Sequence, residues 1–129
     1  MIGEFSRFDD VRLFLLGGEY HRDLYYLGGG LMAGVLETIK ADTVFLGADG
    51  VDARGHCLAL NPDVARDAQM MLRRARRRIL LADATKVGNR AGAVYGTLQD
   101  FDLWITTLGM PRALFKRLCQ ATTIREVTS

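Results

Sequence analysis

The chain has 129 residues, of which 49% are hydrophobic and 25% charged, and a formal net charge of +2. These values are typical of one folded globular domain and exclude a long disordered region. The small net charge gives no ground for nucleic-acid binding, and no apolar run approaches the roughly 20 residues that span a bilayer. Because the two cysteines also lack the spacing of zinc ligands, we expect a soluble cytoplasmic protein without a membrane segment, a metal site or a disulfide framework.

Apolar runs that end at turn residues predict strands, and apolar residues at helical spacing predict helices. In chain order, the predicted elements are strands at Val11–Leu16 and Asp23–Leu27, a helix at Leu31–Ala41, a strand at Thr43–Leu46, a helix opened by Asn61 and Pro62, strands at Ile79–Ala82, Ala93–Tyr95 and Leu103–Thr106, a helix at Pro111–Cys119 and a strand at Thr123–Val127. The central helix has a good N-cap residue, a proline at its first position, and two aspartates that suit its positive end, Asp63 and Asp67.

The alternation of strands and helices indicates an α/β fold. We expect residues 1–129 to form a single domain with a mostly parallel, Rossmann-like sheet and helices on both faces. In such sheets ligands bind beyond the carboxyl ends of the strands. Loops rich in glycine and aspartate follow the predicted strands at 17–18, 47–55 and 83–88, so these loops are the candidate ligand site.

The loop at 47–52 is the most informative of the three. Its glycines allow the backbone to approach a ligand, and the carboxylates of Asp49 and Asp52 are able to accept hydrogen bonds from sugar hydroxyls. The alternative is a tight turn in which each aspartate caps its own backbone. The residue pattern leaves both interpretations open.

Lys86 lies a few residues after a predicted strand, with Asp83 and Thr85 beside it. A lysine at the carboxyl end of a strand is able to pair with a phosphate as a point charge. The alternative is an exposed surface lysine. Adjacent strands would bring this loop and the loop at 47–52 to one crevice, which favours the phosphate interpretation.

A dense basic cluster follows the central helix pattern, at Arg73, Arg74, Arg76, Arg77 and Arg78. We place its first four arginines on a helix whose other side is apolar, so a solvated or subunit-facing surface is expected. Few aromatic residues lie nearby to stack bases, and no helix-turn-helix pattern fits the chain. The cluster is therefore not assigned to DNA.

No catalytic motif is present. The two histidines, His21 and His56, have no nucleophilic residue at a sequence spacing that is typical of a catalytic site. The sequence contains neither GxSxG nor HExxH. Tyr20, Tyr25 and Tyr26 suit a core or a subunit interface better than a pocket.

Three motifs in order resemble the effector-sensing domain of bacterial DeoR-family transcriptional repressors: LLGGEY at 15–20, FLGADGV at 45–51 and LADATKVG at 81–88. The resemblance runs from about Val11 to Val127. It implies a fold related to the sugar-phosphate isomerases and deaminases, a phosphorylated sugar as ligand, and a homo-oligomer. It also implies contact with DNA only through an N-terminal module, which we expect to be absent from this chain. The residues that match the family's loops are Gly17, Gly18, Gly47, Asp49, Gly50, Asp83 and Lys86.

The chain departs from the family pattern in two places. Family sensor domains begin with a strand, a Gly/Ser/Thr-rich loop and a helix, and this first strand–helix unit is missing, so we expect a partial domain. In addition, Thr106 and Thr107 stand where the family often has an aspartate.

We therefore expect a phosphosugar sensor with no cofactor and no catalysis. A sugar-phosphate isomerase or deaminase is the first alternative, although Gly50 stands where the isomerases are expected to have a glutamate. The second alternative is an oligomerisation piece without a ligand, because an exposed strand edge favours self-association.

Overall fold

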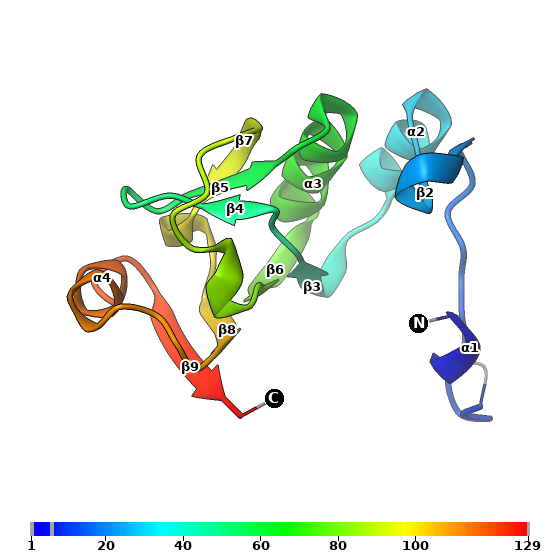
Figure 1. Ribbon diagram of the computed structural model, residues 1–129. Helices are drawn as coiled ribbons and strands as arrows, with labels where there is room; N and C mark the ends of the chain where they lie inside the picture. The colour runs from blue at the N-terminus through cyan, green and yellow to red at the C-terminus, as the bar shows by residue number, and fades with distance from the viewer. Residues whose placement is uncertain (1, 6, 129) are drawn as a thin grey trace.

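The computed structural model describes residues 2–5 and 7–128, and Figure 1 shows their arrangement. The predicted domain, 1–129, therefore includes three residues outside the described ones. The helices are α1 (Ile2–Phe5), α2 (Gly30–Thr38), α3 (Pro62–Arg74) and α4 (Arg112–Leu118), with 3₁₀ helices η1 (Arg22–Leu24), η2 (Ala84–Lys86) and η3 (Leu98–Asp100). The strands are β1 (Glu19–His21), β2 (Tyr26–Gly28), β3 (Ala41–Leu46), β4 (Gly50–Val51), β5 (His56–Ala59), β6 (Ala75–Leu81), β7 (Ala93–Thr97), β8 (Leu103–Thr107) and β9 (Thr123–Val127). Within the described ranges, no helix has the length and apolar character needed to cross a bilayer.

The central feature is a four-stranded parallel sheet in the order β3-β6-β8-β9. Parallel neighbours require crossover connections, and here α3 lies between β3 and β6 in the chain and α4 between β8 and β9. The register aligns Leu46 with Leu80 and Leu80 with Trp104, so side chains on one face form continuous apolar rows. The predicted α/β class with a parallel, Rossmann-like sheet against which helices pack is confirmed.

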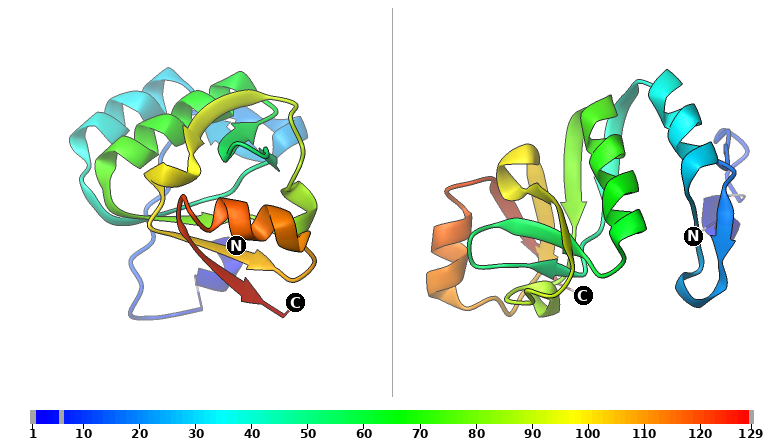
Figure 2. Two further views of the ribbon diagram at one scale, coloured as in Figure 1. Left: turned by 90° about the vertical axis from the view of Figure 1, so that its left-hand side faces the viewer. Right: turned by 90° about the horizontal axis from the view of Figure 1, so that it is seen from above.

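The helices cover one face of this sheet. Leu46, Leu80 and Trp104 belong to the same buried cluster as residues of both α3 and α4, and Figure 2 shows the two helices on the same side of the strands. Right-handed crossovers that progress in one direction across a sheet produce this arrangement. The opposite face exposes Phe45 by 58% and Leu81 by 46%. The prediction of helices on both faces is therefore wrong for the described part of the chain.

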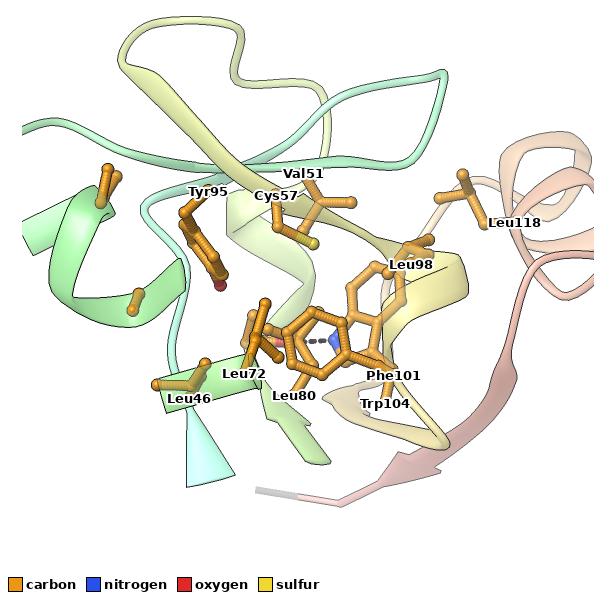
Figure 3. Close-up of a cluster of buried hydrophobic side chains, with 14 of the residues drawn as sticks. Leu46, Val51, Cys57, Leu72, Leu80, Tyr95, Leu98, Phe101, Trp104 and Leu118 are labelled. Carbon is orange, nitrogen blue, oxygen red and sulfur yellow. Dashed lines mark hydrogen bonds between the residues drawn. The ribbon is translucent and has the colours of Figure 1, made fainter. Parts of the chain in front are cut away.

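The core lies between the parallel sheet, the two helices and a second sheet (Figure 3). Leu80 and Trp104 are fully buried at its base. The Trp104 Nε1 donates a hydrogen bond of 2.8 Å to the carbonyl oxygen of Ala82. A buried indole needs a partner for its N–H, and this bond supplies it at the carboxyl end of β6.

The second sheet is antiparallel, in the order β4-β5-β7, and only β7 is predicted from the sequence. β4 has two residues, which is too short for a periodic signal, and it lies inside the segment expected to be a loop. Val51 on β4 and Cys57 on β5 are both fully buried. The burial of these residues depends on the parallel sheet, which forms the other side of the core. The short strands themselves are too brief to show a pattern that predicts this burial.

The segment before β1 differs most from the prediction. Val11–Leu16 is not a strand, and among its members Val11, Leu13, Phe14 and Leu15 are 43% to 71% exposed (Figure 1, blue). The strand predicted at Asp23–Leu27 is replaced by η1 and β2, because the chain turns at Tyr25 with a φ of 48°. A strand requires a partner for its backbone groups, and β2 finds one in β1 whereas Val11–Leu16 finds none among the described residues.

The basic cluster is divided between two elements. α3 ends at Arg74, and Ala75 has a ψ of 145° and begins β6 by pairing with Ala41. The placement of Arg76 and Arg77 on the helix is therefore wrong, because strand pairing overrides the helical preference of the arginines. The cluster lies at the amino end of β6, at the opposite edge of the sheet from the predicted ligand loops.

Candidate functional site

A cavity of about 360 Å³ opens at the carboxyl end of β3, and we refer to it as the β3-end cavity. Small-molecule sites in proteins occupy about 300–1,000 Å³. The residues that line the β3-end cavity are Tyr26, Leu46, Gly47, Ala48, Asp49, Ala59, Val64, Asp67, Ala68, Met71 and Tyr95. Two of the predicted ligand residues, Gly47 and Asp49, are among them, so the loop after β3 borders a space large enough for a metabolite.

The loop after β3 is held in place by three hydrogen bonds, with a residue of β7, a residue of β5 and Leu60, which follows β5. The Tyr95 hydroxyl on β7 donates a bond of 2.6 Å to the carbonyl oxygen of Gly47. Asp49 donates its backbone N–H to the carbonyl oxygen of Leu58, and its Oδ2 accepts the backbone N–H of Leu60, each at 2.9 Å. One oxygen of Asp49 therefore fixes the loop to the residue that follows β5 and does not cap the loop's own backbone. Contact between Asp49 and a sugar hydroxyl stays a prediction.

Besides Asp49, the hydroxyl of Tyr95 is a polar group of the cavity whose position is fixed by a hydrogen bond. Its side chain is 2% exposed, and burial raises the pKa of its hydroxyl above the ordinary value. The hydroxyl therefore stays protonated at neutral pH and acts as a hydrogen-bond donor to the loop.

Asp67 and Tyr26 line the same cavity, and neither was predicted as a site residue. The Tyr26 hydroxyl on β2 donates to the Oδ2 of Asp67 on α3, and the backbone N–H of Gly29 donates to the same oxygen at 3.3 Å. The signal for Asp67 is present in the sequence, because it falls at helical spacing among Val64, Ala68 and Met71, on the buried face of the helix. Tyr26 has no comparable signal, because its partner lies 41 residues away.

The second predicted loop adjoins the first. β3 and β6 are parallel neighbours, so their carboxyl ends share one edge of the sheet. The Asn89 Nδ2 donates to the carbonyl oxygen of Asp49 at 3.0 Å, and the Gly88 N–H donates to the carbonyl oxygen of Val51 at 2.8 Å. The structure thus brings the loops at 47–52 and 83–89 together.

Asp83 and Lys86 do not line the β3-end cavity. The Asp83 carboxylate accepts hydrogen bonds from the hydroxyl and the backbone N–H of Thr85, and these bonds hold its pKa below the ordinary value. Lys86 is partly exposed at the end of η2, and no lysine or arginine is among the described residues that line the cavity. A phosphate in contact with Lys86 would therefore lie outside the cavity.

The remaining predicted residues are not among those that line the cavity. Gly18 packs against the backbone of Gly28. Gly17 precedes β1, and among the described residues other than its chain neighbours no heavy atom lies within 4 Å of the position of a Cβ at Gly17. Gly50 is buried in β4, where a Cβ would lie 2.8 Å from the carbonyl oxygen of Asn89. The close approach at Gly50 serves packing between the two loops.

Asp52 serves the hairpin between β4 and β5. Its carboxylate accepts backbone N–H groups of Arg54 and His56, at 2.8 and 2.9 Å, and lies 2.8 Å from the His56 Nδ1. Burial alone would raise the pKa of Asp52, but the hydrogen bonds from His56 and Arg54 outweigh it and hold the pKa below the ordinary value. This carboxylate is occupied within the turn.

The described residues thus define an α/β domain with a metabolite-sized cavity at the carboxyl edge of a parallel sheet. Residues 1–107 match the family model described as the DeoR C terminal sensor domain, so the chain belongs to this family. The resemblance seen in the sequence is confirmed, although the matched range starts earlier and ends earlier than the range from Val11 to Val127.

Three curated relatives of the chain are transcriptional regulators. The chain is 31% identical over 98 residues to the HTH-type transcriptional regulator GlpR of Haloferax volcanii, which covers 76% of this chain and 38% of the relative. It is 28% identical over 98 residues to the HTH-type transcriptional repressor GlcR of Bacillus subtilis, with the same coverage. It is 28% identical over 112 residues to the HTH-type transcriptional regulator GolR of Listeria innocua, covering 87% of this chain and 44% of the relative. The chain therefore spans less than half the length of the curated relatives it matches.

Proposed function

We propose that this sensor domain binds a phosphorylated sugar at the carboxyl edge of its parallel sheet and thereby controls a transcriptional regulator of carbohydrate metabolism. The observation that carries the proposal is the junction of two loops beside the β3-end cavity: the loop with Gly47 and Asp49, and the loop with Asp83 and Lys86. Parallel sheets bind ligands at this edge. The relatives' designation as regulators supports a binding role without catalysis.

The ligand is assigned in two parts. The sugar occupies the β3-end cavity, where Asp49 and the Tyr95 hydroxyl offer polar groups beside apolar walls. The phosphate lies toward Lys86, because the cavity itself is lined by two aspartates and by no basic residue among those described. Like charges repel strongly in a partly buried site, so the phosphate is placed outside it.

The test is a thermal-shift and calorimetric screen of the chain against ribose 5-phosphate, fructose 6-phosphate, glucose 6-phosphate and their unphosphorylated sugars. A probe at about 100 times its Kd adds roughly 2.7 kcal/mol of stability. Lys86→Ala should weaken binding of a phosphorylated probe by about 1.5–3 kcal/mol, the value of a charged hydrogen bond. Lys40→Ala is the matched control, because Lys40 is exposed and precedes β3 at the opposite edge of the sheet. Equal binding by the Lys86→Ala variant would remove Lys86 from the site.

Partners of the full regulator are assigned in the same way. We assign DNA contact to a helix-turn-helix part of the regulator and not to this domain, and we expect the domain to form homo-oligomers.

One observation favours the second candidate function, self-association without ligand: Phe45 and Leu81 are exposed on the open face of the parallel sheet. Light scattering with and without the probes separates the two candidates, because an oligomer that no probe binds or alters would support self-association alone.

A further inference from the structure

Asp67 is a polar residue of the β3-end cavity to which the proposed function assigns no contact with the ligand. It lies on α3 and is 1% exposed. Burial of a carboxylate is costly unless hydrogen bonds or an opposite charge compensate it. The partners of its two oxygens therefore decide what the residue is able to do.

The two oxygens differ. Oδ2 accepts from the Tyr26 hydroxyl and from the Gly29 N–H, whereas Oδ1 is buried and has no hydrogen-bond partner among the described residues. No described lysine, arginine or histidine forms an ion pair with Asp67. A carboxylate offers about four acceptor sites. Asp67 thus has spare acceptor capacity, and it belongs to the lining of the cavity.

We infer that Asp67 is a specificity-determining residue, which accepts a hydrogen bond from a hydroxyl or amino group of the bound effector. The inference rests on the proposed function, since it assigns one end of the same ligand. A carboxylate accepts and does not donate, so the ligand group that meets it must be a donor. Val64 and Met71 line the same cavity, and in such apolar surroundings a hydrogen bond is stronger than in water.

The inference also orients the ligand. Asp67 and Asp49 both line the cavity, and no basic residue among those described accompanies them. A phosphate is repelled from these carboxylates, whereas a polyol or an amino sugar is attracted. The donor end of the effector therefore meets Asp67, and the phosphate end points toward the loop with Lys86.

Asp67 has a structural role as well, because its bond to Gly29 links α3 to the start of α2. A loss of stability on substitution would not by itself separate the two roles. The decisive readout is the selectivity among ligands that differ by one donor, because a purely structural residue changes all affinities alike.

The experiment compares the wild type with Asp67→Asn, which keeps an acceptor oxygen for Tyr26 and Gly29. Asp63→Asn is the matched control, since Asp63 lies on the same helix, is 54% exposed and pairs with Arg66 at 3.2 Å. Affinities are measured by calorimetry for ribose 5-phosphate, glucose 6-phosphate and glucosamine 6-phosphate, for the parent sugars, and for monodeoxy analogues of the tightest probe.

We expect Asp67→Asn to weaken the tightest probe about tenfold or more, and Asp63→Asn to leave it within about twofold. In the wild type, removal of one particular hydroxyl should cost about tenfold or more, and Asp67→Asn should lose this discrimination at the same position. A preference for glucosamine 6-phosphate over glucose 6-phosphate that the variant loses identifies the donor as an amino group.

Unchanged discrimination at every position in Asp67→Asn would overturn the inference. If Asp67→Asn does not fold, Tyr26→Phe is used in its place. Tyr26→Phe removes the hydrogen-bond donor to the Oδ2 of Asp67 and should alter discrimination at the same position of the ligand. Unchanged discrimination in Tyr26→Phe would also overturn the inference. If only unphosphorylated sugars bind, the phosphosugar proposal fails while the Asp67 comparison still applies. If no probe binds the wild type, both are overturned.

Discussion

Trp104→Phe tests whether the core is packed as the structure shows. Trp104 is fully buried in β8, and its Nε1 donates to the carbonyl oxygen of Ala82 at 2.8 Å. The smaller ring leaves a cavity that costs about 1–2 kcal/mol. Ala82 is 6% exposed, so its carbonyl loses its donor away from water, at a further cost of about 1–3 kcal/mol. We expect the free energy of unfolding to fall by about 3 kcal/mol in total.

The measurement is urea unfolding followed by far-UV circular dichroism, because Trp104 is the single tryptophan and its fluorescence disappears in the variant. Phe14→Leu is the control, since Phe14 is 71% exposed and its substitution should change stability by less than about 0.5 kcal/mol. A loss below about 1 kcal/mol for Trp104→Phe would refute the assignment of Trp104 to a close-packed core with a buried hydrogen bond.

Two further predictions concern the loops of the site. Tyr95→Phe removes the hydroxyl that holds the carbonyl oxygen of Gly47, so stability should fall by about 1 kcal/mol in thermal melts and sugar-phosphate binding should weaken, whereas Tyr20→Phe, at a position 56% exposed, should do neither. Asp52 has a folded-state pKa below its unfolded value near 3.8, so its contribution to stability is present above that pH and is lost as the pH falls through the lower folded value. Thermal melts from pH 6 to pH 2 should therefore show Asp52→Asn less stable than the wild type at pH 6, with the difference closing below pH 4; a constant difference would contradict the role of the carboxylate charge.

The sequence predicted correctly those helices and strands whose capping residues or side-chain composition lie within the element itself. The helix opened by Asn61 is confirmed, and the Asn61 side chain accepts the backbone N–H groups of Asp63 and Val64 as an N-cap does. The strand at Thr123–Val127 is confirmed with the same bounds. In both cases the residues themselves carry the capping groups or the apolar and β-branched side chains that favour the element.

The predictions that were wrong needed information from distant residues. Val11–Leu16 has the composition of a strand but finds no partner among the described residues, and Arg76 and Arg77 follow a helix yet join a strand because Ala75 pairs with Ala41. Backbone hydrogen bonding in a sheet is a property of two segments, so one segment's composition does not decide it.

For the candidate site, the order of the glycine and aspartate loops was enough to indicate the family and the edge of the sheet, because parallel strands deliver the loops that follow them to one side. The sequence by itself thus determined the α/β class, the capped central helix and two cavity residues, Gly47 and Asp49. Only the tertiary structure decided that the helices cover one face, that Lys86 is not among the residues that line the cavity, and that Tyr26 meets Asp67 across 41 residues. The physical reason is that helix caps and strand composition act over a few residues, whereas a cavity is formed by side chains that only chain crossovers bring together.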